Sequence, residues 1–244
     1  MKIVAIVEAR MTSSRLPGKV LLEVLDVPML GRLINRLKQI PLLREIVIAT
    51  TTNPEDDEIC KTASEFGVNF YRGSENDVMS RVLEAGLATN ADVIVEITGD
   101  CPIIDTEIIT EVVQKYLEGN YDYVSNSNVR SYPDGMDVQV FSIETLVNSS
   151  QSTTDKLHRE HVTLHIRQNP ERYRLLDLVA KREFHFPELG LTLDTPEDFR
   201  LIEEIITHLE PQNSFFGLRE VLDLLETYPA LKELNQHVKR KGDT

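Results

Sequence analysis

The first half of the chain alternates short apolar runs with longer stretches in which apolar residues recur at helical spacing. Four runs predict buried strands, over Lys2–Val7, Glu45–Thr50, Asn69–Tyr71 and Asp92–Thr98. The stretches between them predict helices, most clearly over Met29–Gln39 and Asp56–Phe66. Strands that alternate with helices pair in parallel, so the pattern predicts an α/β layered sheet.

The alternation becomes less regular after residue 121. Tyr121–Asn126 and Met136–Ser142 predict two further strands, and Leu191–Leu193 predicts a short one. The polar segment Ser149–Asn169 predicts a helical arm, and the residues beyond Phe215 predict a helical tail. We expect a main domain over residues 1–210, with the arm within about 126–170, and a C-terminal helical extension over 211–244.

Residues that cap helices mark several of the predicted helix starts. Ser74 and Asp77 have capping-box spacing, with Asp in place of the usual Glu. The predicted N-caps are Asn53, Ser74, Asp105 and Thr195. Pro196 suits the first helical position after Thr195, which leaves Asp194 available for a role other than capping.

Composition and charge exclude several classes of partner. The 244 residues are 41% hydrophobic, which is a globular balance, and 40 acidic against 26 basic residues give a net charge of −14. A nucleic acid or an anionic membrane calls for spread basic surface, so we expect neither as a partner. No apolar run approaches the length of about 20 residues that a membrane helix needs, and the two cysteines are too few for a disulfide framework, so we expect a cytoplasmic protein. A small anionic ligand needs only a local cluster of cations.

Such a cluster follows the first predicted strand, in the segment Ala9–Lys19. Ligands of open parallel sheets sit beyond the carboxyl ends of the strands, so this loop lies in a suitable place. Cations and hydroxyls gather there, and they are Arg10, Thr12, Ser13, Ser14, Arg15 and Lys19. This set predicts a cradle for a polyphosphate, although the loop is neither a Walker loop nor a Gly-x-Gly-x-x-Gly turn. A solvated surface loop is the alternative.

Two aspartates end predicted strands and are candidate metal ligands. Asp100 follows Ile97-Thr98-Gly99, and Asp194 follows Leu191–Leu193. Mg²⁺ prefers one or two carboxylates together with substrate phosphates. The alternative for Asp100 is a turn or capping aspartate, and its convergence with Asp194 depends on the fold.

Seven motifs in order resemble the CMP-sugar-acid synthetase superfamily, which includes the CMP-Kdo and acylneuraminate cytidylyltransferases. They are ARMTSSRLPGK, IVIATTTNPEDD, FYRGSENDVMSR, VEITGDCPIID, YPDGMDVQVFS, REHVT and LTLDTPEDF. The resemblance runs from Met1 to about Ile206, and it is strongest to the spore-coat polysaccharide biosynthesis protein F branch. Together the motifs are a specific signal, whereas any one alone would be weak.

The resemblance implies a Rossmann-like nucleotide-diphosphosugar transferase fold and a nucleotide site in the first loop. The residues it assigns to the nucleotide, CTP, are Ala9, Arg10, Ser13, Ser14, Arg15 and Lys19, joined by Arg72 and Asp77. It implies that Asp100 and Asp194 resemble the Mg²⁺ ligands of the family, and that Arg15, Lys19 and Asp100 are the catalytic group. An acceptor hydroxyl would attack the α-phosphorus and displace pyrophosphate.

The resemblance also suggests acceptor residues, and several of them have a structural alternative. The candidates are Arg81, Asp134, Asp137, Arg159 and His161. Arg81 and its neighbours Arg72 and Asp77 would otherwise form a helix cap and a surface ion pair, and Asp134 and Asp137 would otherwise build a turn. The acceptor implied is an acidic sugar or a similar anionic molecule, and the family implies a homodimer with the Ser149–Asn169 arm as a candidate contact.

Two positions depart from the pattern of the family. Glu8 stands where many relatives carry Gln or Pro, and Gly190 stands where relatives of the nearest branch often carry Arg. The first bears on nucleotide preference, and the second on a phosphate or acceptor contact. The leading hypothesis is a Mg²⁺-dependent cytidylyltransferase of surface-polysaccharide synthesis. The alternatives are a nucleotidylyltransferase with a phosphate-bearing acceptor, a glycosyltransferase of similar fold, and a non-catalytic nucleotide-binding homologue.

Overall fold

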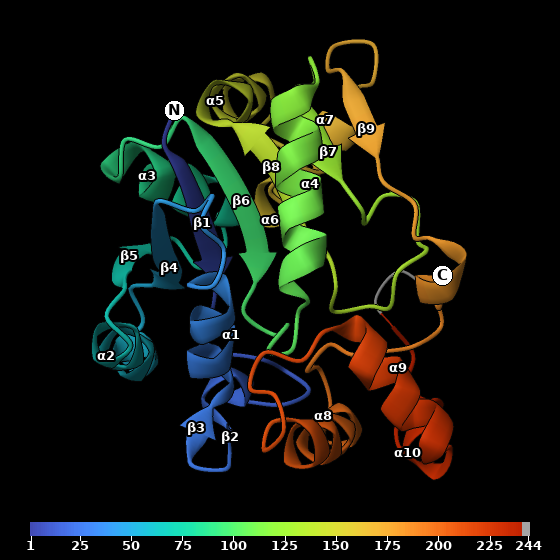
Figure 1. Cartoon of the computed structure of the whole chain (residues 1–244). Helices are drawn as coiled ribbons and strands as arrows, with labels where there is room; N and C mark the ends of the chain where they lie inside the picture. The colour runs from blue at the N-terminus through green and yellow to red at the C-terminus, as the bar shows by residue number, and fades with distance from the viewer. Residues whose placement is uncertain (241–244) are drawn as a thin grey trace.

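A mixed β-sheet occupies the centre of the molecule, with helices over both of its faces (Figure 1). The structure is a computed structural model that describes residues 1–240. Within these residues the sheet has seven strands, in the order β5 (Asn69–Gly73), β4 (Glu45–Thr51), β1 (Ile3–Glu8), β6 (Val93–Thr98), β8 (Gln139–Ser142), β7 (Tyr123–Ser125) and β9 (Leu175–Asp177). The first four are parallel, β8 is antiparallel to β6 and β7, and β9 is parallel to β7. The predicted three-layer α/β fold with a mostly parallel mixed sheet is confirmed.

The two helix layers follow from the alternation of side chains along the buried strands. In β1, Ile3, Ala5 and Val7 belong to one apolar core, and Val4 and Ile6 belong to the other. The first core includes residues of α1 (Met29–Leu37), α2 (Asp57–Glu65), α4 (Thr106–Glu118), α8 (Pro196–Leu209) and α9 (Leu218–Thr227). The second includes residues of α3 (Val78–Ala88), α5 (Ile143–Ser152) and α7 (Leu164–Arg167).

Short elements connect and cover these layers. They are the hairpin of β2 (Glu23–Val24) and β3 (Val27–Pro28), the 3₁₀ turns η1 (Lys19–Leu21), η2 (Pro54–Asp56) and η3 (Arg182–Phe184), and the helices α6 (Lys156–Glu160) and α10 (Ala230–Glu233). No helix among residues 1–240 has both the length and the apolar character needed to cross a membrane.

Parallel pairing brings the carboxyl ends of the central strands to one edge of the sheet. Glu8, the last residue of β1, is in register with Thr98 of β6 and with Ala49 of β4. The amide of Gly99 continues the pairing and donates to the carbonyl of Glu8 at 2.7 Å. The loops after β1 and β6 therefore leave the sheet side by side.

In the second half the strand predicted over Leu191–Leu193 is wrong, the predicted helical arm is divided into separate helices, and strand β9 was not predicted. Leu191–Leu193 is a buried loop, because the amides of Leu191 and Leu193 donate to the carbonyls of Asp134 and Asp100 in two different loops, and no strand among residues 1–240 pairs with it. The polar arm Ser149–Asn169 is not one helix. Thr153 is extended at the end of α5, and Asp155 then caps the separate helix α6, since Asp and Thr side chains compete for backbone groups.

The predicted helix caps have mixed outcomes. Asp105 and Thr195 are N-caps as predicted, and Thr195 forms a capping box with Asp198. Ser74 is not an N-cap. The helix begins at Val78, and Asp77 caps it by accepting from the amide of Ser80, while Ser74 accepts from the amide of Asp77. Asn53 precedes the turn η2 without a side-chain capping bond.

Candidate active site

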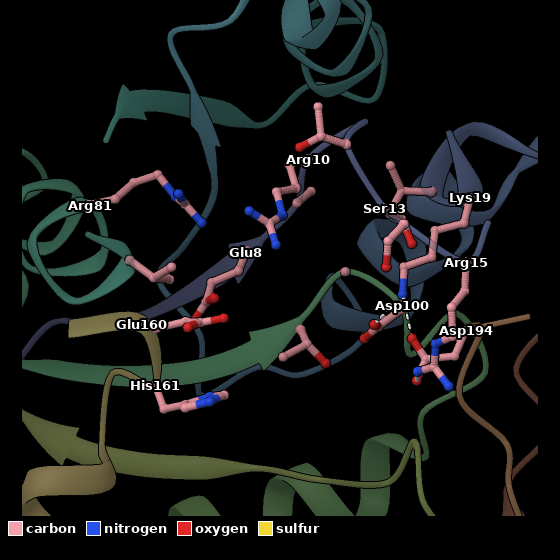
Figure 2. A pocket seen from close by; sticks show the side chains of 17 residues that line it. Glu8, Arg10, Ser13, Arg15, Lys19, Arg81, Asp100, Glu160, His161 and Asp194 are labelled. Carbon is pink, nitrogen blue, oxygen red and sulfur yellow. Dashed lines mark hydrogen bonds and ion pairs between the residues drawn. The ribbon is translucent and has the colours of Figure 1, made fainter. Parts of the chain in front are cut away.

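A cleft of about 340 Å³ opens beyond the carboxyl ends of β1 and β6, where the sequence predicts a ligand site. The Ala9–Lys19 loop forms one side of it, and the ends of both strands form its floor (Figure 2). Its lining includes predicted nucleotide and metal residues, namely Ala9, Arg10, Ser13, Ser14, Arg15, Lys19, Asp100 and Asp194. The fold therefore brings residues as distant in the sequence as Ala9 and Asp194 to the same cleft.

The Ala9–Lys19 loop is held by its own backbone and by one buried carboxylate. The carbonyl of Met11 accepts from the amides of Ser13 and Gly18, each at 2.9 Å, and Gly18 has φ 71°, a conformation that favours glycine. Asp56 is fully buried and accepts from the amide of Met11 at 2.8 Å and from that of Thr51 at 3.1 Å. The sequence identified Asp56 only as an acid of a first helical turn, so this anchor was missed.

Three charged side chains converge at one end of the cleft. Lys19 Nζ lies 2.6 Å from Asp100 Oδ2 and 2.8 Å from Asp194 Oδ1, so the ammonium bridges the two carboxylates. Burial by itself lowers the pKa of Lys19, but the charges and hydrogen bonds of Asp100 and Asp194 outweigh it, so the pKa of Lys19 is raised. Asp100 and Asp194 thus converge on a single cation.

Arg15 adds a second cation to this end, because its Nη2 lies 2.7 Å from Asp194 Oδ2. Asp194 follows the buried Leu191–Leu193 loop, and Asp100 follows Gly99 at the end of β6. A β-carbon at Gly99 would lie 2.7 Å from the carbonyl oxygen of Glu8, so only glycine allows the two strand ends to approach this closely.

The chemistry of this donor set fits a magnesium ion held by two carboxylates. Asp100 and Asp194 already hold one ammonium between them, at distances that show their oxygens directed at a common point. No group of three or more potential metal ligands occurs in the described part of the chain. A metal here would therefore complete its coordination with phosphate oxygens and water, which is the usual arrangement for Mg²⁺.

The other end of the cleft is formed by a different set of charged groups. Figure 2 shows Arg81, Glu8, Glu160 and His161 around it, at some distance from the Lys19 cluster. Arg81 is buried and donates to the carbonyl of Ser74 at 2.5 Å. Arg81 and His161 were predicted as acceptor residues, and the structure places both in the lining of the cleft.

Glu8 forms a buried pair with Glu96, two residues before the end of β6. Burial raises the pKa of Glu8, and burial together with the charge of Glu8 raises the pKa of Glu96 well above its ordinary value. Two buried carboxyl groups this close disfavour ionisation of both, and the upward shift of the pKa is larger for Glu96 than for Glu8. Nothing in the sequence pattern pointed to Glu96, which reads as part of an apolar strand.

Three of the predicted nucleotide and acceptor residues, Arg72, Asp77 and Arg159, form hydrogen bonds and ion pairs beside the cleft. Arg72 does not line it, because its guanidinium donates to the carbonyls of Thr51 and Asn53 and pairs with Asp57. Asp77 and Arg159 form a two-pronged ion pair, with contacts of 2.6 and 2.9 Å, beside the lining residues Arg10 and Glu160.

The remaining two acceptor candidates, Asp134 and Asp137, also lie outside the lining of the cleft. Arg130 pairs with Asp137 at 2.8 Å and lies 3.8 Å from Asp134. Burial, and then the charge of Asp137, raises the pKa of Asp134 to about 6. Asp100 contributes to the raised pKa values of both, so the two residues add negative charge near the proposed metal carboxylates.

Comparison with known proteins identifies the family of this chain. The sequence profile of a family described as cytidylyltransferase matches residues 4–233. The chain belongs to the cytidylyltransferase family. It is therefore an enzyme of the nucleotidyltransferase class, as the motifs predicted.

Individual members of the cytidylyltransferase family show how far the likeness extends. The chain is 37% identical to an uncharacterized protein of Methanocaldococcus jannaschii, over 99% of this chain and 98% of that one. It is 33% identical to the spore coat polysaccharide biosynthesis protein SpsF of Bacillus subtilis, over 83% and 85%. A cytidylyltransferase structure from Leptospira borgpetersenii superposes with a TM-score of 0.91 at 29% identity, covering 99% of both chains.

A more distant structure supports the fold alone. A CMP:2-keto-3-deoxy-manno-octonic acid synthetase complexed with CTP superposes with a TM-score of 0.64 at 19% identity, covering 85% of this chain and 99% of the other. This likeness concerns the fold, and the description of the cleft residues rests on the structure of this chain alone.

Proposed function

We propose that this cytidylyltransferase transfers CMP from CTP to an acidic sugar or a similar anionic acceptor, with Mg²⁺ as cofactor and release of pyrophosphate. The observation that carries the proposal is the Lys19 ammonium held between Asp100 and Asp194, at one end of a cleft walled by the Ala9–Lys19 loop. Two carboxylates and two cations at one point suit a triphosphate with its metal ion.

The proposed role of each cleft residue follows from its position. Lys19 and Arg15 would bind the triphosphate oxygens and stabilise the charge that develops as pyrophosphate leaves. Ser13, Ser14 and the loop backbone would orient the phosphates, with Ala9 and Arg10 nearer the nucleoside. Asp100 and Asp194 would hold Mg²⁺, which supplies neutralisation of phosphate charge and polarises the reacting phosphate when bound.

The reaction itself is a displacement at the α-phosphorus. An oxygen of the acceptor forms a bond to that phosphorus, the bond to the bridging oxygen of the β-phosphate breaks, and the acceptor proton passes to solvent or a nearby base. Such a transfer depends on positioning and charge neutralisation more than on a strong base. Such a transfer needs no covalent intermediate with a side chain of the cleft.

An anionic acceptor is supported by the cations at the far end of the cleft. Arg81 and His161 line that end, and Arg159 lies beside it. Relatives that share this family are named as 3-deoxy-manno-octulosonate cytidylyltransferases, including a Geobacter metallireducens protein that is 32% identical over 46% of this chain and 44% of its own length. We further propose that the enzyme works in the cytoplasm as a homodimer, in surface-polysaccharide synthesis.

The proposal is tested by measuring pyrophosphate release from each of the four nucleoside triphosphates, with Mg²⁺ and a panel of sugar acids and sugar phosphates. We expect release with CTP and a sugar acid. Release only with a sugar 1-phosphate would mean that the acceptor is a sugar phosphate and not a sugar acid. CTP binding without pyrophosphate release under any combination would indicate a non-catalytic homologue. Light scattering of the purified chain tests the homodimer.

Substitution of one carboxylate tests the metal assignment. Asp100→Asn should reduce turnover at least 100-fold while the unfolding transition changes little, because the amide keeps the shape but not the charge of the ligand. The matched control is Asp223→Asn on the exposed side of α9, which should retain full turnover. Full activity of the Asp100→Asn enzyme would contradict the assignment.

A further inference from the structure

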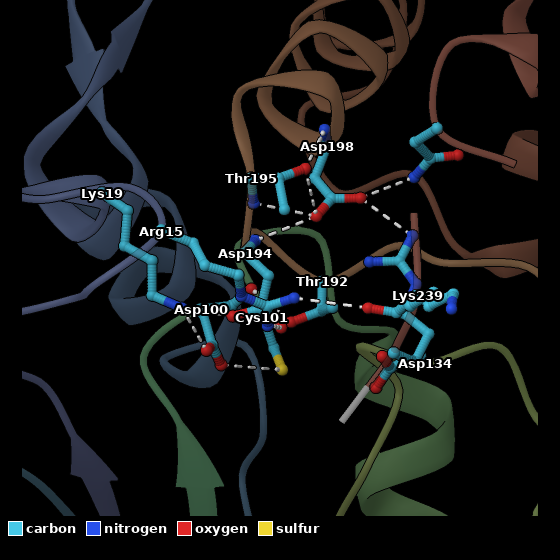
Figure 3. A network of polar contacts seen from close by, with 12 residues as sticks. Arg15, Lys19, Asp100, Cys101, Asp134, Thr192, Asp194, Thr195, Asp198 and Lys239 are labelled. Atoms are coloured by element: carbon cyan, nitrogen blue, oxygen red, sulfur yellow. Dashed lines mark hydrogen bonds and ion pairs between the residues drawn. The ribbon is translucent and has the colours of Figure 1, made fainter. Parts of the chain in front are cut away.

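Residues Asn235–Arg240 lie against the end of the cleft that holds Asp100 and Asp194. After α10 the chain returns along the loop that carries Asp194, and Figure 3 shows Lys239 beside Arg15 and Asp194. The carbonyl oxygen of Lys239 accepts from Arg15 Nη1 at 3.3 Å. The same Arg15 guanidinium holds Asp194 through its other terminal nitrogen. The tail therefore contacts a residue that contacts the proposed ligand.

A second series of contacts joins residues Asn235–Arg240 to Asp194 through Asp198. Arg240 Nη2 lies 2.8 Å from Asp198 Oδ1, and Asn235 Nδ2 donates to the same oxygen at 2.7 Å. The other carboxylate oxygen, Oδ2, accepts from the amides of Asp194 at 3.2 Å and Thr195 at 2.9 Å. Asp198 thus joins the tail to the backbone at Asp194.

Asp198 needs a cation in this position because its side chain has no exposed surface. A buried carboxylate is costly unless it is paired and hydrogen-bonded, and Arg240, with a side chain that is only 13% exposed, supplies the charge. Without that charge, the buried Asp198 carboxylate would lack its cation, and the turn at Asp194 and Thr195 would be held less firmly.

The lack of a side chain at Gly190 leaves the space that the Arg240 guanidinium occupies. A β-carbon on Gly190 would lie 1.7 Å from Arg240 Nη2 and 2.1 Å from Arg240 Cζ, so any side chain there would displace the guanidinium. Asn235 also donates to the carbonyl of Gly190 at 2.9 Å. The departure from the family at this position is therefore accompanied by an arginine that reaches the same space from the C-terminal end.

We propose that residues Asn235–Arg240 complete the active site from the same chain, with Arg240 and the Lys239 carbonyl acting as positioning groups for Asp194 and Arg15. The proposal rests on the proposed function, because it takes Asp194 as a metal ligand and Arg15 as a triphosphate contact. Groups that orient metal ligands from behind commonly change metal affinity or activity by about 10- to 100-fold when they are removed.

The test uses the full chain with two variants that remove the guanidinium in different ways. Arg240→Ala deletes it, and Gly190→Ala displaces it while leaving Arg240 in the sequence. Each should raise the Mg²⁺ concentration for half-maximal rate by at least 10-fold and lower kcat. Gly190→Ala should add nothing in the Arg240→Ala background, because the collision it causes is then absent. Arg240→Lys should recover part of the loss, since a lysine still offers Asp198 a charge.

A readout that does not depend on activity accompanies the kinetics. Hydrogen exchange at the amides of Asp194 and Thr195 should accelerate at least 10-fold in both variants, because these amides are bonded to Asp198. The matched control is Arg219→Ala, which removes an arginine of α9 that is 60% exposed and 3.9 Å from Glu183. It should leave both the exchange at these amides and the Mg²⁺ dependence unchanged.

The outcomes separate this proposal from the proposed function. An active wild-type enzyme whose two variants keep the Mg²⁺ dependence within twofold would overturn the positioning role, even if exchange accelerates. Unchanged exchange at Asp194 and Thr195 would also overturn it. A wild-type chain that releases no pyrophosphate would instead contradict the proposed function, and the exchange data would still decide whether the tail anchors this turn. If Arg240→Ala fails to fold, Gly190→Ala and Arg240→Lys supply the same comparison.

Discussion

The carboxyl group of Asp134 gives a quantitative prediction about stability and pH. Burial, and then the negative charge of Asp137, raises its pKa from 3.8 to about 6 in the folded protein. One pKa unit corresponds to about 1.4 kcal/mol, so the difference amounts to about 3 kcal/mol. This is the free energy by which an ionised Asp134 destabilises the folded state at neutral pH.

The sign follows from proton binding. Between pH 3.8 and about 6 the folded protein retains a proton on Asp134 that the unfolded chain has lost, so the stability falls as pH rises through this range. Below pH 3.8 both states are protonated and the effect is absent. Above pH 6 both are ionised and the full cost applies.

Asp134→Asn removes the titration while it keeps the shape of the side chain. We expect the variant to be more stable than wild type by up to about 3 kcal/mol at pH 8, with a difference that shrinks toward zero near pH 4. Guanidinium unfolding of both proteins at half-unit pH steps measures it. A difference that stays constant between pH 4 and pH 8 would refute the reasoning.

Asp122→Asn is a control of opposite sign. Hydrogen bonds and the charge of Arg174 lower the pKa of Asp122, so this carboxylate stabilises the folded state above its unfolded pKa and the stabilisation is lost as pH falls. The control variant should therefore be less stable than wild type at pH 8 and similar to it in acid. At pH 8 the same unfolding series should therefore show Asp134→Asn to be more stable than wild type and Asp122→Asn to be less stable.

Three further predictions concern the floor and the loop of the cleft. Gly99→Ala places a methyl group 2.7 Å from the Glu8 carbonyl and should destabilise by about 1–3 kcal/mol, measured by denaturant unfolding. Asp56→Ala leaves the buried amides of Met11 and Thr51 without their acceptor, so it should cost about 3 kcal/mol and weaken CTP binding, whereas Asp57→Asn, on an exposed carboxylate, should do neither. Glu96→Gln cannot ionise, and because burial and then the charge of Glu8 raise the pKa of Glu96 well above its ordinary value, the stability of the variant relative to wild type should increase as the pH rises above 4.5. A relative stability that does not change with pH would contradict this reasoning.

The first half of the fold was predictable because its local pattern and its tertiary environment agree. The run Lys2–Val7 is apolar at every position after Lys2, and the strand it forms, Ile3–Glu8, is covered on both faces. The second half was harder, because local bonding decided its elements. Leu191 and Leu193 are as buried as strand residues, yet their amides bond to loops. The strand Leu175–Asp177 is three half-buried residues and carries no pattern of its own.

For the site, the sequence by itself determined the kinds of residues and the family. The loop from Ala9 to Lys19 and the two strand-end aspartates were recognisable from residue type and order, since phosphate and Mg²⁺ chemistry restricts which side chains serve. Which residues share the cleft was decided only by the tertiary structure. Lys19 meets Asp100 because parallel pairing places the loops after β1 and β6 at one edge of the sheet, and Asp194 joins them because the amide of Leu193 donates to the carbonyl of Asp100.

The same reason explains what the sequence could not indicate. The pKa of Glu96 is raised well above its ordinary value only because two neighbouring strands place its carboxyl group and that of Glu8 in one buried space. Arg240 reaches Asp198 and the space over Gly190 only because the C-terminal extension folds back along the Asp194 loop. Local sequence determines which conformations and chemistries are available, but burial and charge pairing between distant segments arise only when the chain has closed on itself.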